Sequence, residues 1–257
     1  MERVGCRTVV GCAFATSPLR LLLPDNHGHA AWVYLATLGG GLVGGDAIDL
    51  RVDVAPAAAL LLGTQASTKV YRSTRGCSQR IAVDAGDESL VALVPDPVVS
   101  FAGAQYAQET HVALGHDASL FLLDGFTSGR KARGERWQFE RIASRTIIER
   151  GGRALLVDAT RLDPRHGSVA DRMGRFDVML TLVAVGPRFR GAREAMLATR
   201  HVPSSRDRVV VAASAVGSDG AILRVGAERF EDASLVLRPS FSQLTEALGD
   251  DPFARKW

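Results

Sequence analysis

The fold of this chain is decided by residues 38–72, which read LGGGLVGGDAIDLRVDVAPAAALLLGTQASTKVYR. Gly39, Gly41 and Gly44 match the G-x-G-x-x-G spacing of dinucleotide-binding proteins. In those proteins the glycines open a helix whose N-terminus faces a pyrophosphate. Here apolar residues instead occupy every second position of residues 48–54, the pattern of a half-buried β-strand. The glycines therefore predict a strand–turn–strand connection and not a nucleotide site.

A unit of strand, short turn and strand recurs at intervals of roughly thirty residues, a period typical of stacked repeats. The turns are rich in glycine, aspartate and alanine, for example AGDES at residues 85–89 and GHDAS at residues 115–119. Strand-rich units favour a β-helical, solenoid-like fold or layered sheets of consecutive hairpins. We therefore expect a mainly β fold of stacked strand repeats, forming one domain over residues 1–257.

The segments outside the repeats predict further strands and about two α-helices. Before the repeats we expect strands at residues 8–14, 19–23 and 31–38. After a polar loop at residues 161–175, further strands are expected at residues 176–182, 209–215 and 221–225, the last two joined by a tight turn. Helices are expected at residues 189–200 and 238–249, the second with Pro239 near its start and Gly249 after its end.

Composition excludes several classes of protein. The net charge of +3 comes without a clustered Lys/Arg tract, which disfavours nucleic-acid binding. Cys6, Cys12 and Cys77 form no C-x-x-C pair, so no disulfide framework is expected. The N-terminal segment lacks the apolar core of a signal peptide, and no apolar run is long enough to cross a bilayer. We expect a cytoplasmic protein that contacts no membrane.

Catalytic motifs fail on spacing. The residue three before Lys69 is Ala66, where S-x-x-K needs a serine, and Ser128 comes one place too late for G-x-S-x-G. No cluster of titratable residues supplies a base, an orienting group and an oxyanion device. The sequence therefore predicts a protein without catalytic residues.

The remaining polar candidates are carboxylates near predicted strand ends, namely Asp46, Asp96, Asp124, Glu135 and Asp158. Acidic residues at such junctions often form turns. Along a groove or channel, however, they would offer weak oxygen ligands that pass a divalent cation along without trapping it. Two alternatives stay open: a scaffold without a metal path, and a β-solenoid carbohydrate-active enzyme. The enzyme would need paired carboxylates and aromatic platforms, whereas the three Trp and three Tyr are scattered.

Four motifs in the chain resemble, in order and spacing, the UreD/UreH family of urease accessory proteins. They are GGGLVGGD at residues 39–46, TQASTKVYRS at 64–73, VPDPVVSFAGAQY at 94–106 and DGFTSGRKARGERWQF at 124–139. The resemblance implies a helix-like stacked β fold with two α-helices and a non-enzymatic chaperone of urease maturation. Its implied partners are the urease apoprotein, UreF and, through UreF, the GTPase UreG, with dimerisation through UreF. No tightly bound cofactor is implied; nickel would be in transit, through an internal channel.

Site residues follow from the matched motif positions. Asp46, Asp96 and Glu135 are the candidates for the nickel path. The positions expected to serve structure or partner contact are Gly44, Gly45, Gln65, Thr68, Lys69, Tyr71, Pro95, Gly129, Arg130 and Gly134. Gly44 and Gly45 are expected to permit a tight turn. The side chains of Gln65 and Thr68 are expected to satisfy buried backbone groups between rungs. Lys69 is expected to contact a partner or to balance a carboxylate.

Overall fold

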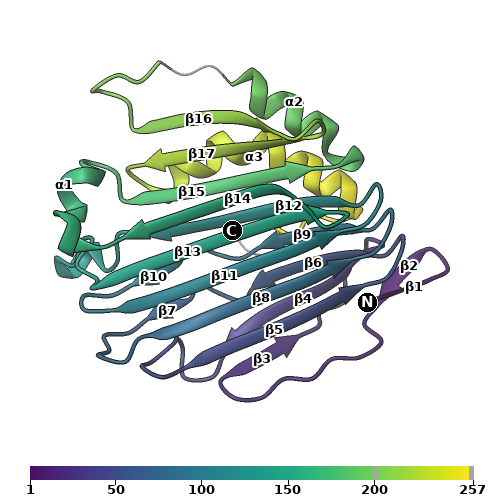
Figure 1. Cartoon of the computed structure of the whole chain (residues 1–257), viewed down its shortest axis with the longest axis horizontal. Helices are drawn as coiled ribbons and strands as arrows, with labels where there is room; N and C mark the ends of the chain where they lie inside the picture. Colours follow the sequence, from purple (N-terminus) through teal and green to yellow (C-terminus); the bar gives the residue numbers. More distant parts are fainter. Residues whose placement is uncertain (200–201, 255–257) are drawn as a thin grey trace.

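The long parallel strands alternate between two facing sheets along the chain, so this part of the chain winds as a β-solenoid (Figure 1). The structure, a computed structural model, describes residues 1–199 and 202–254. The first sheet contains the parallel strands β4 (Ala31–Thr37), β6 (Ala59–Thr64), β9 (Leu90–Val94) and β12 (Ser119–Thr127). The second contains the parallel strands β5 (Ala47–Val54), β8 (Cys77–Ala85), β11 (Gln105–Leu114) and β13 (Arg141–Arg150). The predicted stacked repeats are confirmed, in the solenoid form with about three turns.

Further strands extend this framework. In the first sheet β3 (Leu19–Leu22) pairs with β4, and β15 (Val178–Val185), β17 (Gly220–Ala227) and β16 (Val209–Val216) continue from β12, all antiparallel. In the second sheet β14 (Arg153–Leu162) runs antiparallel to β13. The short strands β7 (Lys69–Val70) and β10 (Val98–Ser100) pair with each other, and β1 (Glu2–Val4) and β2 (Arg7–Val9) form a separate hairpin. The strand expected at residues 8–14 therefore ends early, and its partner is β1.

The glycine-rich segment is a turn, as predicted. Gly39, Gly40 and Gly41 have φ angles of +92°, +75° and +157°, and β5 follows with strictly alternating burial. The turns at the other end of the strands repeat a single conformation, because Ala57, Glu88 and Asp117 all have a φ angle between 52° and 58°. This left-handed backbone is costly for residues other than glycine.

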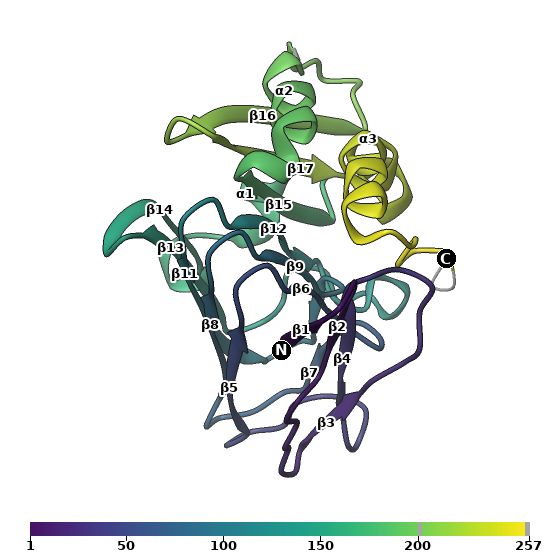
Figure 2. The same cartoon turned by 90° about the vertical axis from the view of Figure 1, so that its right-hand side faces the viewer.

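Helices cover one face of the first sheet (Figure 2). They are α2 (Arg190–Ala198) and α3 (Phe230–Leu248), whereas α1 (Val169–Met173) lies in the segment expected to be a loop. Short 3-10 helices occur at η1 (Lys131–Arg133), η2 (Pro164–His166) and η3 (Pro187–Phe189). The helix α3 begins at Phe230 and contains Pro239, so the expectation that Pro239 marks its start is wrong; Gly249 caps its end as predicted. A proline costs a helix one hydrogen bond, and here burial of the apolar face of α3 offsets that loss.

Two large apolar cores hold these layers together. One lies between the two sheets, and the other lies between the first sheet and the helices α2 and α3. In the described part of the chain, no helix combines the length and the apolar character needed to cross a membrane.

Candidate functional site

The four motifs, far apart in sequence, form neighbouring loops at the left of Figure 1, where β7 and β10 lie. The backbone N–H of Leu42 donates to the oxygen of Lys69 at 2.8 Å, and that of Val99 donates to the oxygen of Thr68 at 2.9 Å. The N–H of Gly103 donates to the oxygen of Gln138 at 3.0 Å. We call the surface formed by residues 39–46, 64–73, 95–104 and 128–139 the motif face.

Residues from all four motifs contact one another in a row across the motif face. A Cβ on Gly41 would lie 2.7 Å from the Tyr71 ring, so only glycine fits there. The Tyr71 and Phe101 rings meet edge to face with centroids 5.1 Å apart, and the Arg130 guanidinium lies 4.1 Å from the Phe101 centroid. Arg130 in turn binds both carboxylate oxygens of Glu135. Such contacts stabilise one relative arrangement of the loops.

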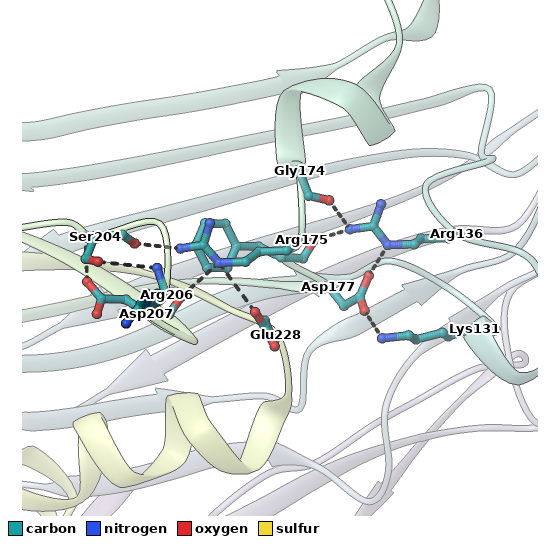
Figure 3. A network of polar contacts seen from close by, with 10 residues as sticks. Lys131, Arg136, Gly174, Arg175, Asp177, Ser204, Arg206, Asp207 and Glu228 are labelled. Carbon is teal, nitrogen blue, oxygen red and sulfur yellow. Dashed lines mark hydrogen bonds and ion pairs between the residues drawn. The ribbon is translucent and has the colours of Figure 1, made fainter.

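Asp177 anchors the fourth motif to the start of β15 (Figure 3). Its carboxylate lies 2.5 Å from Lys131 Nζ and 2.5 Å from Arg136 Nε. Burial raises the pKa of Asp177, but the hydrogen bonds from these two cations outweigh it and leave the pKa below its ordinary value. Arg136 also donates to the backbone oxygens of Gly174 and Phe176, at 2.6 and 2.9 Å. These contacts fix the loop after β12, which contains the fourth motif, to residues 174–177, directly before β15.

A third cation, Arg175, continues this network. Arg175 stacks over the Phe176 ring and donates to the backbone oxygens of Ser204 and Asp207, at 3.0 and 2.8 Å. It also forms an ion pair with Glu228, next to the start of α3 (Figure 3). The network thus runs from the motif face to the N-terminal end of α3.

Polar side chains interrupt the apolar core between the two sheets. In the second sheet, inward positions at matching register hold Gln79, Gln108, Ser144 and Thr160 in one row, and Thr110, Thr146 and Asp158 in the next. Apolar rows lie on either side of them. We call these residues, together with Asp124 of the first sheet, the interior polar layer.

Asp124 is the centre of the interior polar layer. Its carboxylate accepts hydrogen bonds from Gln108 Nε2 at 2.6 Å and from Ser144 Oγ at 2.9 Å, and the Tyr106 hydroxyl donates to Gln108 Oε1 at 3.1 Å. Burial raises the pKa of Asp124 despite these bonds, and the nearby Asp158 raises it further. Asp124 lines two small cavities, of about 40 Å³ and about 10 Å³, that lie on different sides of it. Asp158 lines the smaller one and is paired with Arg224 at 2.7 Å.

The three predicted nickel-path residues do not form one site. Asp46 accepts a hydrogen bond from the Val43 N–H at 2.8 Å, Asp96 is buried beside α3, and Glu135 is held by Arg130. Hydrogen bonds from Arg130 and from the Ala102 N–H hold the pKa of Glu135 below its ordinary value. Among the described residues, no group of three or more His, Cys, Asp or Glu side chains is placed to hold a metal ion.

The predicted structural residues divide into two groups. The glycines are constrained: Gly45, Gly129 and Gly134 have φ angles of +94°, +105° and +76°, while a Cβ on Gly44 would lie 1.8 Å from Ser73 Oγ. Gln65 and Lys69 are exposed, and Thr68 is half-buried. Gln65 and Thr68 contact neighbouring rungs through main-chain hydrogen bonds: the Gln65 N–H donates to the Leu35 oxygen, and the Thr68 oxygen accepts from the Val99 N–H. A side-chain hydrogen bond in this segment is made by Thr64, whose Oγ1 accepts from the Asp96 N–H at 2.8 Å.

An apolar groove of about 520 Å³ lies beside the third motif, between residues 94–97 and the helix α3. It is lined by Pro95, Asp96, Phe230, Leu235, Phe241 and Phe253. Leu235, which lines the groove, is 64% exposed. Part of the apolar lining of the groove is therefore accessible to solvent.

Sequence reasoning missed the partners of Asp124 and the role of Asp177. The available signal for the first was a polar residue at an inward position of an alternating strand, as at Gln108 and Ser144. Asp177 lies in a segment with no motif, and its two cationic partners, Lys131 and Arg136, come from more than forty residues earlier in the chain. No local pattern identifies it.

The family model described as UreD urease accessory protein matches residues 1–257. A urease accessory protein UreD of Sorangium cellulosum (strain So ce56) is 54% identical over 255 residues, which cover 99% of this chain and 82% of the relative. For the UreD of Anaeromyxobacter sp. (strain Fw109-5) the identity is 41% over 255 residues, covering 98% and 85%. The urease accessory protein D of Arabidopsis thaliana is 30% identical over 287 residues, covering 99% and 98%.

Proposed function

Because the chain belongs to the UreD urease accessory protein family, we propose that it serves urease maturation as a non-enzymatic chaperone that binds the urease apoprotein. In this proposal it acts with UreF and, through UreF, with the GTPase UreG to support the insertion of nickel. Two features support partner binding: the apolar groove along α3, and the motif face, whose loops are fixed by side-chain contacts. A fixed surface binds with little loss of conformational entropy.

We further propose that nickel passes through the interior polar layer. The observation that carries this step is the position of Asp124, which lines both interior cavities. The layer offers carboxylate, hydroxyl and amide oxygens without a closed set of ligands, which suits a cation that must leave again. Asp124 therefore replaces Asp46, Asp96 and Glu135 as the leading candidate, because it lines both cavities and accepts its side-chain hydrogen bonds from the uncharged Gln108 and Ser144. Glu135, by contrast, is paired with Arg130, and Asp158 with Arg224.

Paired carboxylates alone do not make this a glycoside hydrolase. The cavity that Asp124 shares with Asp158 has a volume of about 10 Å³, which holds at most one water molecule and no sugar ring. The remaining alternative is a scaffold protein through which no metal passes. Such a scaffold would bind the same partners, but Asp124 would have no role in nickel transfer.

The test separates the two. The wild-type chain, Asp124→Asn and the control Asp84→Asn, at an exposed aspartate of β8, are each mixed with urease apoprotein, UreF, UreG, GTP and nickel. We expect equal complex formation by all three chains and a loss of urease activation of at least tenfold for Asp124→Asn alone. Full activation by Asp124→Asn would refute the path and leave the scaffold. Failure of the wild-type chain to bind either urease or UreF would refute the chaperone function itself.

A further inference from the structure

The two large sheets end in four edge strands within the described chain, and three of them are protected. The edge strand β5 carries Asp49, Arg51 and Asp53, and β14 carries Arg153, Asp158 and Arg161. The edge strand β3 has only four residues and lies between Pro18 and Pro24. Charges, prolines and short length are the usual means by which proteins prevent edge strands from pairing with other chains.

The fourth edge strand, β16, has none of these protections. Its sequence, VVVAASAV, contains no charged residue and no proline over eight residues. Among the described residues it pairs with β17 alone, so one side of its backbone is unpaired. In the described part of the segment before it, the backbone oxygens of Ser204 and Asp207 accept hydrogen bonds from Arg175. An uncharged edge of this length is a site for the addition of a further strand.

The distribution of side-chain size along β16 indicates the partner. The strand begins with three bulky residues, Val209–Val211, continues with the small residues Ala212–Ala215 and ends at Val216. Against β17, two of the three valines already face alanine or glycine, and Ala213 faces Leu223. An antiparallel second copy of β16, centred on Ala212, would place Val209, Val210 and Val211 opposite Ala215, Ser214 and Ala213. Side chains that face each other across two paired strands contact one another, and these contacts stabilise the sheet.

We propose that a second copy of this chain adds to the β16 edge, forming a two-fold symmetric dimer with one continuous sheet. Symmetric antiparallel pairing sets the central residue of the strand against its own counterpart, so a charge at that position would repel itself. The lack of charge on β16 removes that penalty. This association needs neither UreF nor urease, and it is distinct from dimerisation through UreF.

The test measures the molar mass of the purified full-length chain by light scattering over a range of concentrations, without any partner protein. The wild-type mass should rise toward twice the monomer mass. Ala212→Glu and Ala212→Lys should each stay monomeric, because the new charges would face each other at the centre of the pair. An equimolar mixture of the two should regain the dimer, since lysine then faces glutamate.

The control is Ala47→Lys, the same change at an exposed position of the edge strand β5, and it should behave as wild type. Thermal unfolding of each variant confirms that it is folded before its mass is interpreted. A wild-type chain that stays monomeric at every concentration would overturn the proposal. So would a dimer that neither charge weakens, or a mixture that stays monomeric.

Discussion

The guanidinium of Arg130 lies 4.1 Å from the centre of the Phe101 ring, which joins the third motif to the fourth. The same guanidinium binds Glu135 through two nitrogens. A lysine has no planar fork and cannot make both contacts at once. Arg130→Lys should therefore lower the urea midpoint of unfolding, although it keeps the charge. Arg133→Lys, at an exposed position of η1, is the matched control and should leave the midpoint unchanged.

The close approach of Ser73 to Gly44 means that the stability effects of substitutions at these two positions should depend on each other. A Cβ at this position would lie 1.8 Å from Ser73 Oγ and 2.8 Å from Ser73 Cβ. Gly44→Ala should cost about 1–3 kcal/mol, as overpacked sites do. Ser73→Gly removes both clashing atoms, so the cost of Gly44→Ala should fall in the double variant. A double-mutant cycle from urea unfolding measures this coupling, and purely additive costs would show that the clash is relieved in another way.

The two glycines of this turn are constrained in different ways. Both lie in a tight turn, closed by a hydrogen bond from the Asp46 N–H to the Val43 oxygen at 3.1 Å, but only Gly45 has a positive φ angle. The constraint on Gly44 is the approach of a loop some thirty residues later in the chain, where Ser73 lies. Sequence patterns report local conformation and do not report which loops meet.

The same limit applies to the interior. Alternation predicted the strands and their recurrence, because a period of two is a local property. It did not predict that Gln108 and Ser144 would meet Asp124, since this depends on the register between strands of two sheets. The matched motif positions instead predicted Asp46, Asp96 and Glu135, all of which lie in loops of the motif face.

The repeated turns predict a stabilising change. Glu88 has a φ angle of +57°, where a side chain is strained and glycine is not. Its backbone N–H donates to the His116 oxygen at 2.8 Å, a bond that glycine retains. Glu88→Gly should raise the free energy of unfolding by about 0.5–1 kcal/mol. Glu109→Gly, in the middle of β11, should lower it by a similar amount. A loss of stability in both variants would contradict the assignment of strain at Glu88.

Substitution of Asp177 tests how much its ion pairs with Lys131 and Arg136 stabilise the loop of the fourth motif. Asp177→Asn keeps the shape of the side chain but removes the charge that faces Lys131 and Arg136. Because Lys131 is mostly exposed, its share of the loss is small. The expected cost is about 1–3 kcal/mol, from the hydrogen bonds of Arg136 and the buried carboxylate. Asp84→Asn is the control. Proteolysis within residues 128–139 should also be faster in Asp177→Asn, whereas a uniform loss of stability would leave the cleavage pattern unchanged.

Asp163 predicts the response to acid. Its side chain is buried, and its carboxylate accepts hydrogen bonds from Arg165 Nη2 at 2.8 Å and from Arg161 Nη2 at 3.0 Å. The hydrogen bonds from Arg165 hold the pKa of Asp163 far below its ordinary value of 3.8. The folded state therefore binds this proton less readily than the unfolded chain does. The stabilisation is complete above the unfolded pKa and is lost as the pH falls below it.

Urea unfolding of the wild type between pH 7 and pH 3 should thus show a free energy of unfolding that falls with acid. In Asp163→Asn the value at pH 7 should be lower and its dependence on pH shallower, since the titrating group is gone. The control Asp171→Asn, at an exposed position of α1 close in sequence, should keep the wild-type slope. Equal slopes in wild type and Asp163→Asn would mean that other carboxylates govern acid unfolding and that the Asp163 pairs add little to the folded state.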